Sequence, residues 1–231
     1  MESNKRTARI AGVLYLIVVL AGIFSLGYVP SQLHVTGDAA ATVGNIVAHE
    51  SLFRLGIVAG MICYVAFLLL PLVLYKLLSA YGKVPAALMV VFAVASVPIS
   101  LMAVANKLDI LSLLGDADYL QVFTQEQLQA QVMLSLESYR NGLKVAEIFW
   151  GLWLFPFGYL VYKSGILPKL LGILLMLGCF GYLIGIIGVL LFAGYAESTL
   201  ARFVGIPASV GEIGICLWLL VMGAREYPKA D

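Results

Sequence analysis

Six apolar runs, each close to the length of a membrane-crossing helix, constrain this chain more than any other feature. A helix needs roughly 20 apolar residues to cross the hydrocarbon of a bilayer. The alternation of period two that marks the strands of a membrane β-barrel is missing from the sequence. We therefore expect an all-α fold, a polytopic integral membrane bundle of six transmembrane helices. The expected spans are residues 10–29, 52–78, 84–111, 143–162, 167–191 and 207–223.

Composition agrees with a membrane protein. Of the 231 residues, 62% are apolar and 12% are charged, whereas roughly a quarter of a soluble domain is charged. A soluble domain of this size could not bury so much apolar surface. We expect residues 1–231 to form a single transmembrane domain with membrane lipids as its surroundings, and the net charge of +1 gives no reason to expect a nucleic-acid partner.

Two of the longer connections carry short amphipathic helices of their own. Asp38 is placed to cap a helix that contains Val43 and Ile46. Thr124 and Gln127 have the spacing of a capping box that opens a second helix. We expect both outer-loop helices to lie along the membrane surface, with the second able to run straight into the fourth span.

The basic residues indicate which side of the membrane faces the cytoplasm. Ten of the thirteen acidic residues fall on the opposite side from most of the basic ones. Because short cytoplasmic loops are rich in Lys and Arg, we expect both termini in the cytoplasm. The expected location is the bacterial cytoplasmic (inner) membrane, in which the protein is multi-pass. The nine residues on the cytoplasmic side are Lys5, Arg6, Arg9, Lys76, Lys83, Lys163, Lys169, Arg225 and Lys229.

The fourth span carries a stripe of charged residues. Glu137, Arg140, Lys144 and Glu147 follow spacings of three, four and three, so they share one helix face. Glu147 lies roughly 24 Å along the helix from Lys163, which places it below the outer boundary of the membrane. One interpretation is a pair of ion pairs within the helix. We favour a stripe that faces the interior of the bundle, because lipid would not tolerate it.

Glu212, in the sixth span, allows two interpretations. If this span begins at Pro207, Glu212 lies one turn inside the membrane and needs a cation. Alternatively, Ser209 to Glu212 form a capping box, and the carboxylate binds the backbone at Ser209. Both place a carboxylate in the outer half of the membrane. The basic residues that could pair with it are Arg54, Lys107, Lys144 and Arg202.

The outer ends of four spans therefore supply candidate ligand-binding residues. If the bundle packs them together, they form an outward-facing polar pocket that binds or moves a small or lipid-like ligand. One alternative function is a membrane-embedded enzyme that acts on a lipid with Glu147 and Glu212 as an acid–base pair. The other is a structural or assembly protein without catalysis. The candidate residues are Arg54, Asn106, Lys107, Asp109, Arg140, Lys144, Glu147 and Glu212.

No motif predicts a catalytic residue, a metal site or a cofactor. His34 and His49 both fall in the first outer loop, where we expect them to be solvated. No histidine lies in a span, which argues against haem held between membrane helices. We expect the cysteines to be buried free thiols, since each lies within an apolar run. They are Cys63, Cys179 and Cys216.

The fifth span has a smooth face of small residues. Its glycines recur at spacings of three, four and three, which allows a neighbouring helix to approach closely. The neighbour could be a helix of the same bundle, which we favour, or a second copy in a homo-oligomer. The four glycines are Gly178, Gly181, Gly185 and Gly188.

Several short segments resemble one known family. They are Ala8-Arg9-Ile10-Ala11-Gly12-x-x-Tyr15, Gly37-Asp38-Ala39-Ala40-Ala41-Thr42, Leu52-Phe53-Arg54-Leu55-Gly56-Ile57, and Gly211-Glu212 followed by Leu217-Trp218-Leu219-Leu220-Val221. Together they resemble the bacterial membrane-protein family catalogued as "domain of unknown function 4386". The resemblance covers nearly the whole chain and implies a bacterial multi-pass membrane protein. It implies no activity, but Arg54 and Glu212 stand on matching segments.

Overall fold

The computed structural model describes residues 2–225, and most of this range is helical. Lys229, one of the basic residues expected on the cytoplasmic side, lies outside the described residues. In chain order the elements are α1 (Glu2–Gly22), the π-helical segment η1 (Ile23–Tyr28), α2 (Val29–Leu33), α3 (Ala39–Ala48), α4 (Glu50–Leu78), η2 (Ser79–Tyr81), α5 (Lys83–Leu113), η3 (Asp118–Val122), α6 (Gln125–Ser164), α7 (Lys169–Leu191), η4 (Tyr195–Glu197), α8 (Thr199–Val204) and α9 (Ile206–Val221).

Six helical stretches within the described residues are long and apolar enough to cross a membrane, which confirms the predicted fold class. Most extend past the apolar runs, and side-chain caps at Thr124 and Ser198 start the fourth and sixth stretches among polar residues. The largest differences are in the fourth stretch, which begins at Gln125, and the sixth, which begins at Thr199. The stretches are Asn4–Leu33, Glu50–Tyr81, Lys83–Leu113, Gln125–Ser164, Lys169–Leu191 and Thr199–Val221.

The long helices form a closed ring. Each packs against the next one along the chain, in the order α1, α4, α5, α6, α7 and α9, and α9 packs back against α1. Aromatic side chains fill the middle of this ring. Trp153 of α6 is only 1% exposed, and its ring lies 5.1 Å from Phe67, 5.1 Å from Phe157 and 6.1 Å from Tyr15, measured between centroids.

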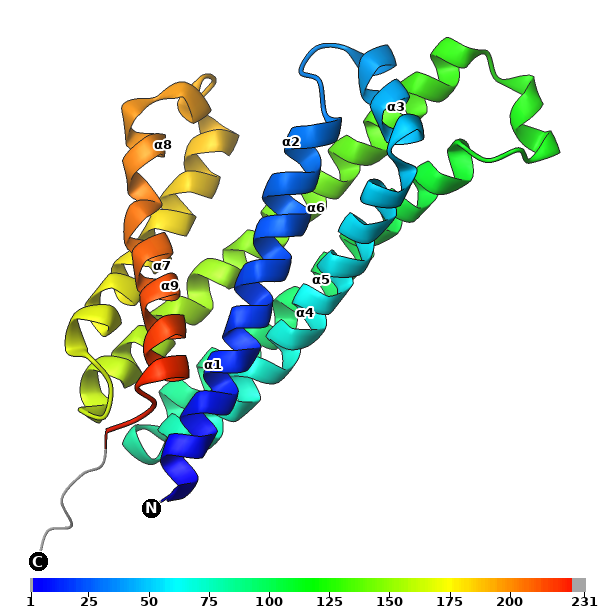
Figure 1. The fold of residues 1–231 in the computed structure, drawn as a ribbon. Helices are drawn as coiled ribbons and strands as arrows, with labels where there is room; N and C mark the ends of the chain where they lie inside the picture. The colour runs from blue at the N-terminus through cyan, green and yellow to red at the C-terminus, as the bar shows by residue number, and fades with distance from the viewer. Residues whose placement is uncertain (1, 226–231) are drawn as a thin grey trace, which may run out of the picture.

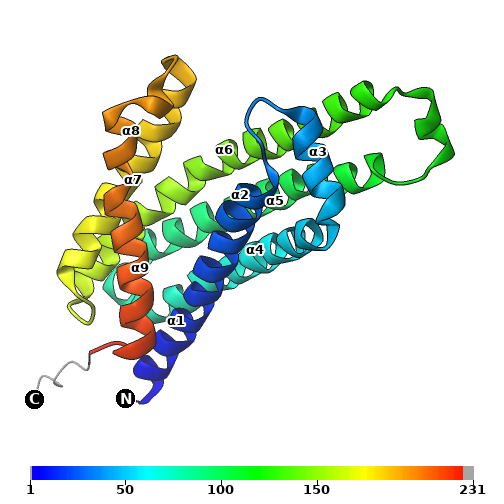
Figure 2. The ribbon, with the colours of Figure 1, turned by 45° about the horizontal axis from the view of Figure 1, so that its top comes forward.

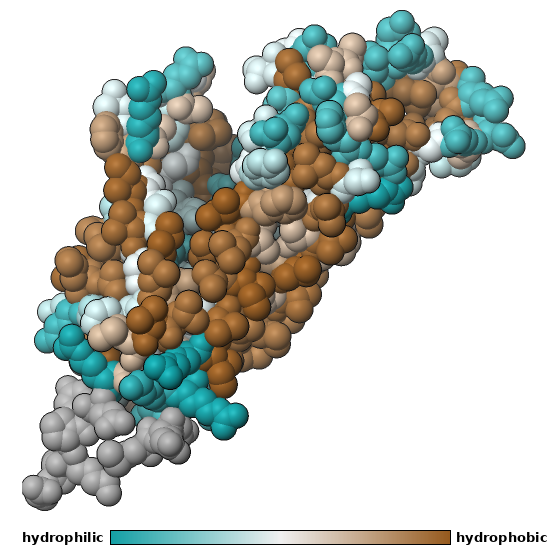
Figure 3. Space-filling model, in the orientation of Figure 1, coloured by the Kyte–Doolittle hydropathy of each residue, from teal (hydrophilic) through white to brown (hydrophobic). Residues whose placement is uncertain are grey.

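The two ends of the bundle differ. The N-terminus and residues 221–225 lie at one end, which we call the terminal end, and α3, η3 and η4 lie at the other, the loop end (Figure 1). At the terminal end α1 and α9 are in close contact, since a Cβ atom built at Gly12 would lie 2.5 Å from the backbone nitrogen of Leu220. Towards the loop end, α8 and the upper part of α9 diverge from α1 and α2 (Figures 1 and 2). The space-filling view shows a hollow between these two parts (Figure 3).

The first membrane-crossing helix is not a regular α-helix throughout. Residues 23–28 have π-helical hydrogen bonding, and Pro30 follows in the first turn of α2. Proline has no N–H, so it leaves the carbonyl of the preceding turn without its usual donor, and a local π-helical register is one way to accommodate this loss. The widened segment lies beside the interior cavities described below, where Leu26 forms part of two walls.

The predicted caps of the outer-loop helices are confirmed. Asp38 accepts a hydrogen bond from the backbone of Ala41 at 2.8 Å and opens α3. Thr124 and Gln127 form the reciprocal capping box at the start of α6. The second of these helices runs straight into the fourth span, which is one of the two arrangements expected for it. That segment is the first part of α6, a single helix from Gln125 to Ser164 that continues through Pro156.

The glycine face of α7 packs against other parts of the same chain. A Cβ at Gly178 would lie 2.8 Å from the Cα of Ala208 in α9. A Cβ at Gly181 would collide with the carbonyl of Val204, and one at Gly188 with the ring of Tyr195. Gly185 has nothing within 4 Å of the Cβ position. A second copy could therefore reach most of this face only by displacing α8, α9 and η4.

Candidate functional site

Three adjoining cavities lie in the middle and the loop end of the bundle. The glycine chamber, about 420 Å³, lies between α6, α7, α8 and α9, with Gly181, Gly185 and Gly205 in its wall. The basic chamber, about 360 Å³, lies between η1, α2, α3, α4, α5 and α6, and its basic residues are His34, Lys107, Arg140 and Lys144. The aromatic chamber, about 300 Å³, lies between α1, η1, α4, α6, α7 and α9, and its aromatic residues are Tyr15, Tyr64, Phe67, Trp150, Trp153 and Tyr182.

Shared walls join the three chambers. Lys144 and Glu147 line both the glycine and the basic chambers. Tyr182 and Ser209 line both the glycine and the aromatic chambers, while Trp150 lines the aromatic and the basic ones. Each volume lies near the lower end of the range for small-molecule sites, roughly 300–1,000 Å³. The system is therefore large enough for a headgroup or a small ligand.

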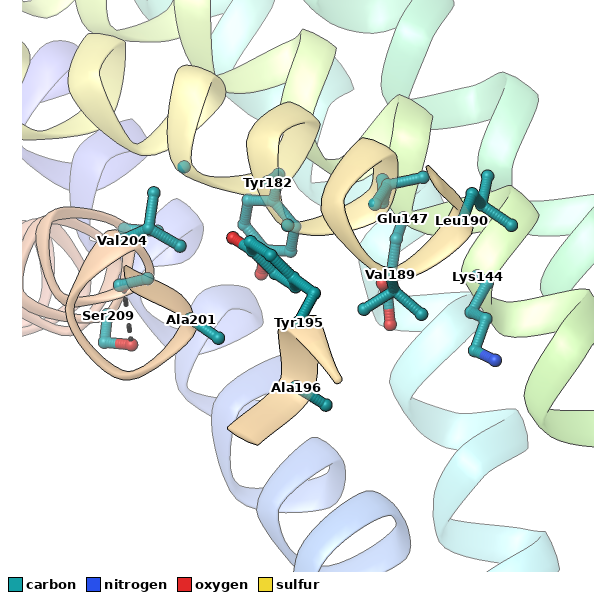
Figure 4. Close-up of a pocket in the computed structure, with 15 residues that line it drawn as sticks. Lys144, Glu147, Tyr182, Val189, Leu190, Tyr195, Ala196, Ala201, Val204 and Ser209 are labelled. Atoms are coloured by element: carbon teal, nitrogen blue, oxygen red, sulfur yellow. Dashed lines mark hydrogen bonds between the residues drawn. The ribbon is translucent and has the colours of Figure 1, made fainter. Parts of the chain in front are cut away.

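The charged stripe of α6 divides into an exposed half and an interior half. Arg140 and Glu137 form the exposed half, with an ion pair of 2.8 Å between Nη2 and Oε2. Lys144 and Glu147 extend from α6 towards the glycine chamber (Figure 4). Their charges attract each other, although they do not approach within ion-pair distance. Lys144 instead donates to Oδ1 of Asn141 at 3.4 Å. The interpretation as ion pairs within the helix therefore holds for Glu137 and Arg140, and the interpretation as a stripe that faces the interior holds for Lys144 and Glu147.

Lys107 is the most deeply buried of the predicted basic residues. Its side chain is 4% exposed, and Nζ lies 4.0 Å from the centroid of the Tyr139 ring. Among residues 2–225, no carboxylate lies within 4.0 Å of this ammonium group. A desolvated cation–π contact contributes about 2 kcal/mol, which offsets only part of the several kcal/mol that burial of an ammonium costs. The basic chamber therefore has an uncompensated positive charge.

His34 corrects one expectation from the sequence. Its ring is half-buried in the wall of the basic chamber rather than solvated in a loop. Nδ1 is buried without a hydrogen-bond partner, and Nε2 lies 3.5 Å from Nη1 of Arg140. The difference arises because α2 extends the first helix as far as Leu33, which brings the next residue against α6. His49, in contrast, is exposed.

Glu212 lies deeper than either sequence interpretation placed it. The capping-box interpretation is wrong, because α9 begins at Ile206 and Ser209 donates its hydroxyl to the carbonyl of Gly205 at 3.3 Å. The apolar helical stretch that contains Glu212 begins at Thr199, roughly 20 Å away along the helix axis. The carboxylate therefore lies near the middle of the span, where it lines the aromatic chamber.

The structure does not bring three of the candidate residues to these chambers. Arg54 is exposed and pairs with Glu50, with 2.6 Å between Nε and Oε1. Asn106 donates to the carbonyl of Ala103 at 3.0 Å, and Asp109 is exposed. None of the three lines a chamber. The chambers bring together the other five, which are Lys107, Arg140, Lys144, Glu147 and Glu212.

Sequence reasoning missed the tyrosines in the middle of the spans. Tyr15, Tyr64 and Tyr182 all line the aromatic chamber. Tyrosines near span ends anchor a helix at the interface, but a phenol at mid-span must find a polar partner inside the protein. Their positions in the middle of the apolar runs were therefore a usable signal for polar groups in the interior of the bundle.

Metal-binding residues do not cluster in the part of the chain that the structure describes. No group of three or more His, Cys, Asp or Glu side chains there could hold a metal ion. Cys63, Cys179 and Cys216 are buried free thiols, as predicted.

Comparisons with known proteins give a family but no activity. The family model described as "Domain of unknown function (DUF4386)" matches residues 10–223. A segment of 90 residues is 37% identical to an "Uncharacterized protein" of Archaeoglobus fulgidus, an alignment that covers 39% of this chain and 51% of that protein. The chain thus spans about half the length of the relative it matches. No solved structure matches the chain.

Proposed function

Since this chain belongs to the family described as "Domain of unknown function (DUF4386)", whose description gives no activity, we propose a function from its chambers: it binds a small or lipid-like ligand at the loop end. The observation that carries the proposal is the shared wall of the glycine and basic chambers, where Lys144 and Glu147 face the interior. Charged side chains inside a membrane span are costly, and by default they indicate a functional site.

The mouth of the aromatic chamber supports a ligand that arrives from the membrane. Ile23 of the first helix and Ile213 of α9 both line this chamber, and they are 59% and 46% exposed. They therefore stand at the edge of the chamber, between η1 and α9, where the interior opens sideways. An opening with apolar edges within a span suits the acyl chain of an amphiphile, while its polar group reaches the charged walls.

We also propose the cytoplasmic side for the terminal end. Lys5, Arg6 and Arg9 precede the first span, and the connections that contain Lys83 and Lys169 lie at the same end of the bundle. An excess of Lys and Arg in short loops favours the cytoplasm. The chambers would then open towards the outer leaflet of the bacterial cytoplasmic membrane.

The acid–base alternative has less support. Glu147 lines the glycine and basic chambers, whereas Glu212 lines the aromatic one. Tyr182 lines both the glycine and the aromatic chambers and so stands in the wall between them. Two carboxylates that act on one substrate must face it together, and these two face different chambers.

Native mass spectrometry of the purified protein tests the proposal. We expect a small molecule or lipid to remain bound to the wild type and to be lost from Glu147→Gln. Gly185→Leu should also lose it, because Gly185 lines the glycine chamber with open space at its Cβ, and leucine would fill that space.

Two matched controls separate these effects from general damage. Glu50→Gln removes an exposed carboxylate that is paired with Arg54. Gly27→Leu adds the same side chain at a helical glycine that is exposed and has nothing within 4 Å of its Cβ position. Both controls should keep the bound species. An identical set of bound species in all four variants would count against a ligand site in these chambers.

A further inference from the structure

The aromatic chamber differs from its neighbours in the sign of its charge. Its wall contains one carboxylate, that of Glu212, and no Lys, Arg or His. The basic chamber, which adjoins it at Leu26 and Trp150, contains four basic residues and one carboxylate, that of Glu147. The two compartments therefore attract groups of opposite charge.

A buried hydroxyl group without a partner lies in the same wall. Tyr15 is 1% exposed, and its hydroxyl oxygen forms no hydrogen bond with any residue that the structure describes. This residue and Tyr182 line the same chamber as Glu212. A buried polar group that lacks a partner costs roughly 1–3 kcal/mol, so the fold retains an acceptor that a ligand could use.

Aromatic rings that pack on one another make up much of the wall. Tyr64 stacks on Trp150 with 6.2 Å between centroids, and Phe67 meets Trp153 edge-on at 5.1 Å. Aromatic faces carry partial negative charge and attract cations. The carboxylate, the phenol oxygens and the ring faces thus all favour the same kind of ligand group, one with positive charge.

The composition of the wall favours an organic cation over a metal ion. Calcium takes six to eight oxygen ligands and magnesium six in near-ideal geometry, whereas this chamber provides a single carboxylate and a few hydroxyl groups among aromatic and apolar side chains. An ammonium group needs fewer oxygen acceptors and gains from ring faces. From this arrangement we infer that the aromatic chamber binds an organic ammonium group, with Glu212 as its counter-ion and the Tyr15 hydroxyl as an acceptor.

This inference rests on the proposed function and specifies the chemistry of its ligand. The ammonium group can belong to the headgroup of an aminophospholipid that reaches the chamber past Ile23 and Ile213, or to a free small amine. The polar contacts within the chamber are the same in both cases, so the experiment must distinguish the two sources.

Tryptophan fluorescence of the full-length protein can report on this chamber. Of the three tryptophans, Trp150 and Trp153 line it, while Trp218 lies near Arg225 at the terminal end. In a Trp218→Phe background, the emission therefore comes from the chamber. The protein is placed in nanodiscs of phosphatidylglycerol alone, which has no amine, and titrated with butylammonium chloride and, separately, with its neutral analogue 1-butanol.

We expect a saturable change with butylammonium and none with 1-butanol. Glu212→Gln should weaken the binding of butylammonium roughly tenfold or more, as expected for a charge-assisted hydrogen bond. Tyr15→Phe, which removes a single oxygen atom and keeps the ring, should weaken it several-fold. Glu197→Gln, a change at an exposed carboxylate on η4, should leave it unchanged. Equal binding of butylammonium and butanol, or wild-type affinity in both Glu212→Gln and Tyr15→Phe, would overturn the inference.

Lipid composition distinguishes the two sources of the ammonium group. If the headgroup is the ligand, nanodiscs that contain increasing phosphatidylethanolamine should raise the apparent Kd for butylammonium. If the ligand is a free amine, the lipid should not compete. Retention of phosphatidylglycerol by the chambers without any binding of butylammonium would refute the ammonium inference and leave the proposed function standing. Binding of butylammonium by a protein whose Glu147→Gln and Gly185→Leu variants keep every species that the wild type retains would support the ammonium inference and count against the proposed site between the glycine and basic chambers.

Discussion

The closure of the helix ring at the terminal end depends on a single glycine. A Cβ atom at Gly12 would lie 2.5 Å from the backbone nitrogen and 2.6 Å from the Cα of Leu220. Non-bonded heavy atoms prefer separations of about 3.5–4.0 Å, so Gly12→Ala requires α1 and α9 to separate by roughly 1 Å. The atoms in the way belong to the backbone and cannot rotate aside, unlike the end of a flexible side chain.

The expected cost follows from this geometry. Overpacking of a close contact costs about 1–3 kcal/mol, and an alanine in a helix gains about 1 kcal/mol over glycine. Gly22→Ala, in the same helix, is the matched control. There a new Cβ would lie 3.7 Å from Sγ of Cys63, an ordinary contact. Because both changes share the propensity gain, the difference between them should equal the cost of the α1–α9 contact, about 1–3 kcal/mol.

Reversible unfolding in mixed micelles, monitored by circular dichroism, measures this difference. Gly12→Ala should unfold at a lower mole fraction of denaturing detergent than Gly22→Ala. The reasoning would be refuted if the two variants unfolded together, since α1 and α9 would then not be held against each other at Gly12.

Three further predictions concern other parts of the chain. Lys107→Met should raise the thermal unfolding temperature, because it removes a buried charge that only the Tyr139 ring offsets. Lys83→Met, at an exposed site, should leave that temperature unchanged. If Lys107→Met lowered the unfolding temperature, the charge of Lys107 would have to be compensated in the native protein. Thr124→Ala should destabilise the start of α6 by about 1 kcal/mol, because it removes the hydroxyl that accepts from the backbone of Gln127. Hydrogen exchange should then be faster for the amides near Gln127, and an unchanged exchange rate would argue against the cap. Green fluorescent protein fused after the last residue should fluoresce in intact bacteria if the terminal end is cytoplasmic, and a dark fusion present at normal level would reverse the proposed orientation.

The helical elements and their caps could be read locally from the sequence. Apolar runs of the right length predicted the membrane-crossing helices, since an isolated segment in lipid must satisfy its own backbone hydrogen bonds. The caps at Asp38 and Thr124 involve residues only three positions apart. Boundaries were less accurate where polar residues continue a helix, as in α6, because the hydropathy pattern marks the edge of the membrane and not the end of the helix.

The candidate site was predicted only in part. Glu147, Lys144 and Lys107 line chambers as expected of charges within spans, and the spacing of three between Lys144 and Glu147 placed them on one face. Arg54 was grouped with them because of its position along the chain, yet a nearby carboxylate, Glu50, pairs with it at the exposed start of α4. The position of Arg54 along the sequence indicated how deep it lies in the membrane, but not the direction in which its side chain points.

Sequence alone determined that this chain crosses a membrane with six helices and where its charges lie along them, because the bilayer acts on each helix separately. Tertiary structure decided which faces meet: Gly12 brings α9 onto α1, and Gly181 brings α8 and α9 onto α7. Only that packing places Glu212 and Tyr15 in one chamber and Lys107 in another. The contacts join residues that are far apart in the sequence, such as Cys216 and Gly12, which are 204 positions apart. Close packing between helices depends on the shapes of both partners, which neither segment carries by itself.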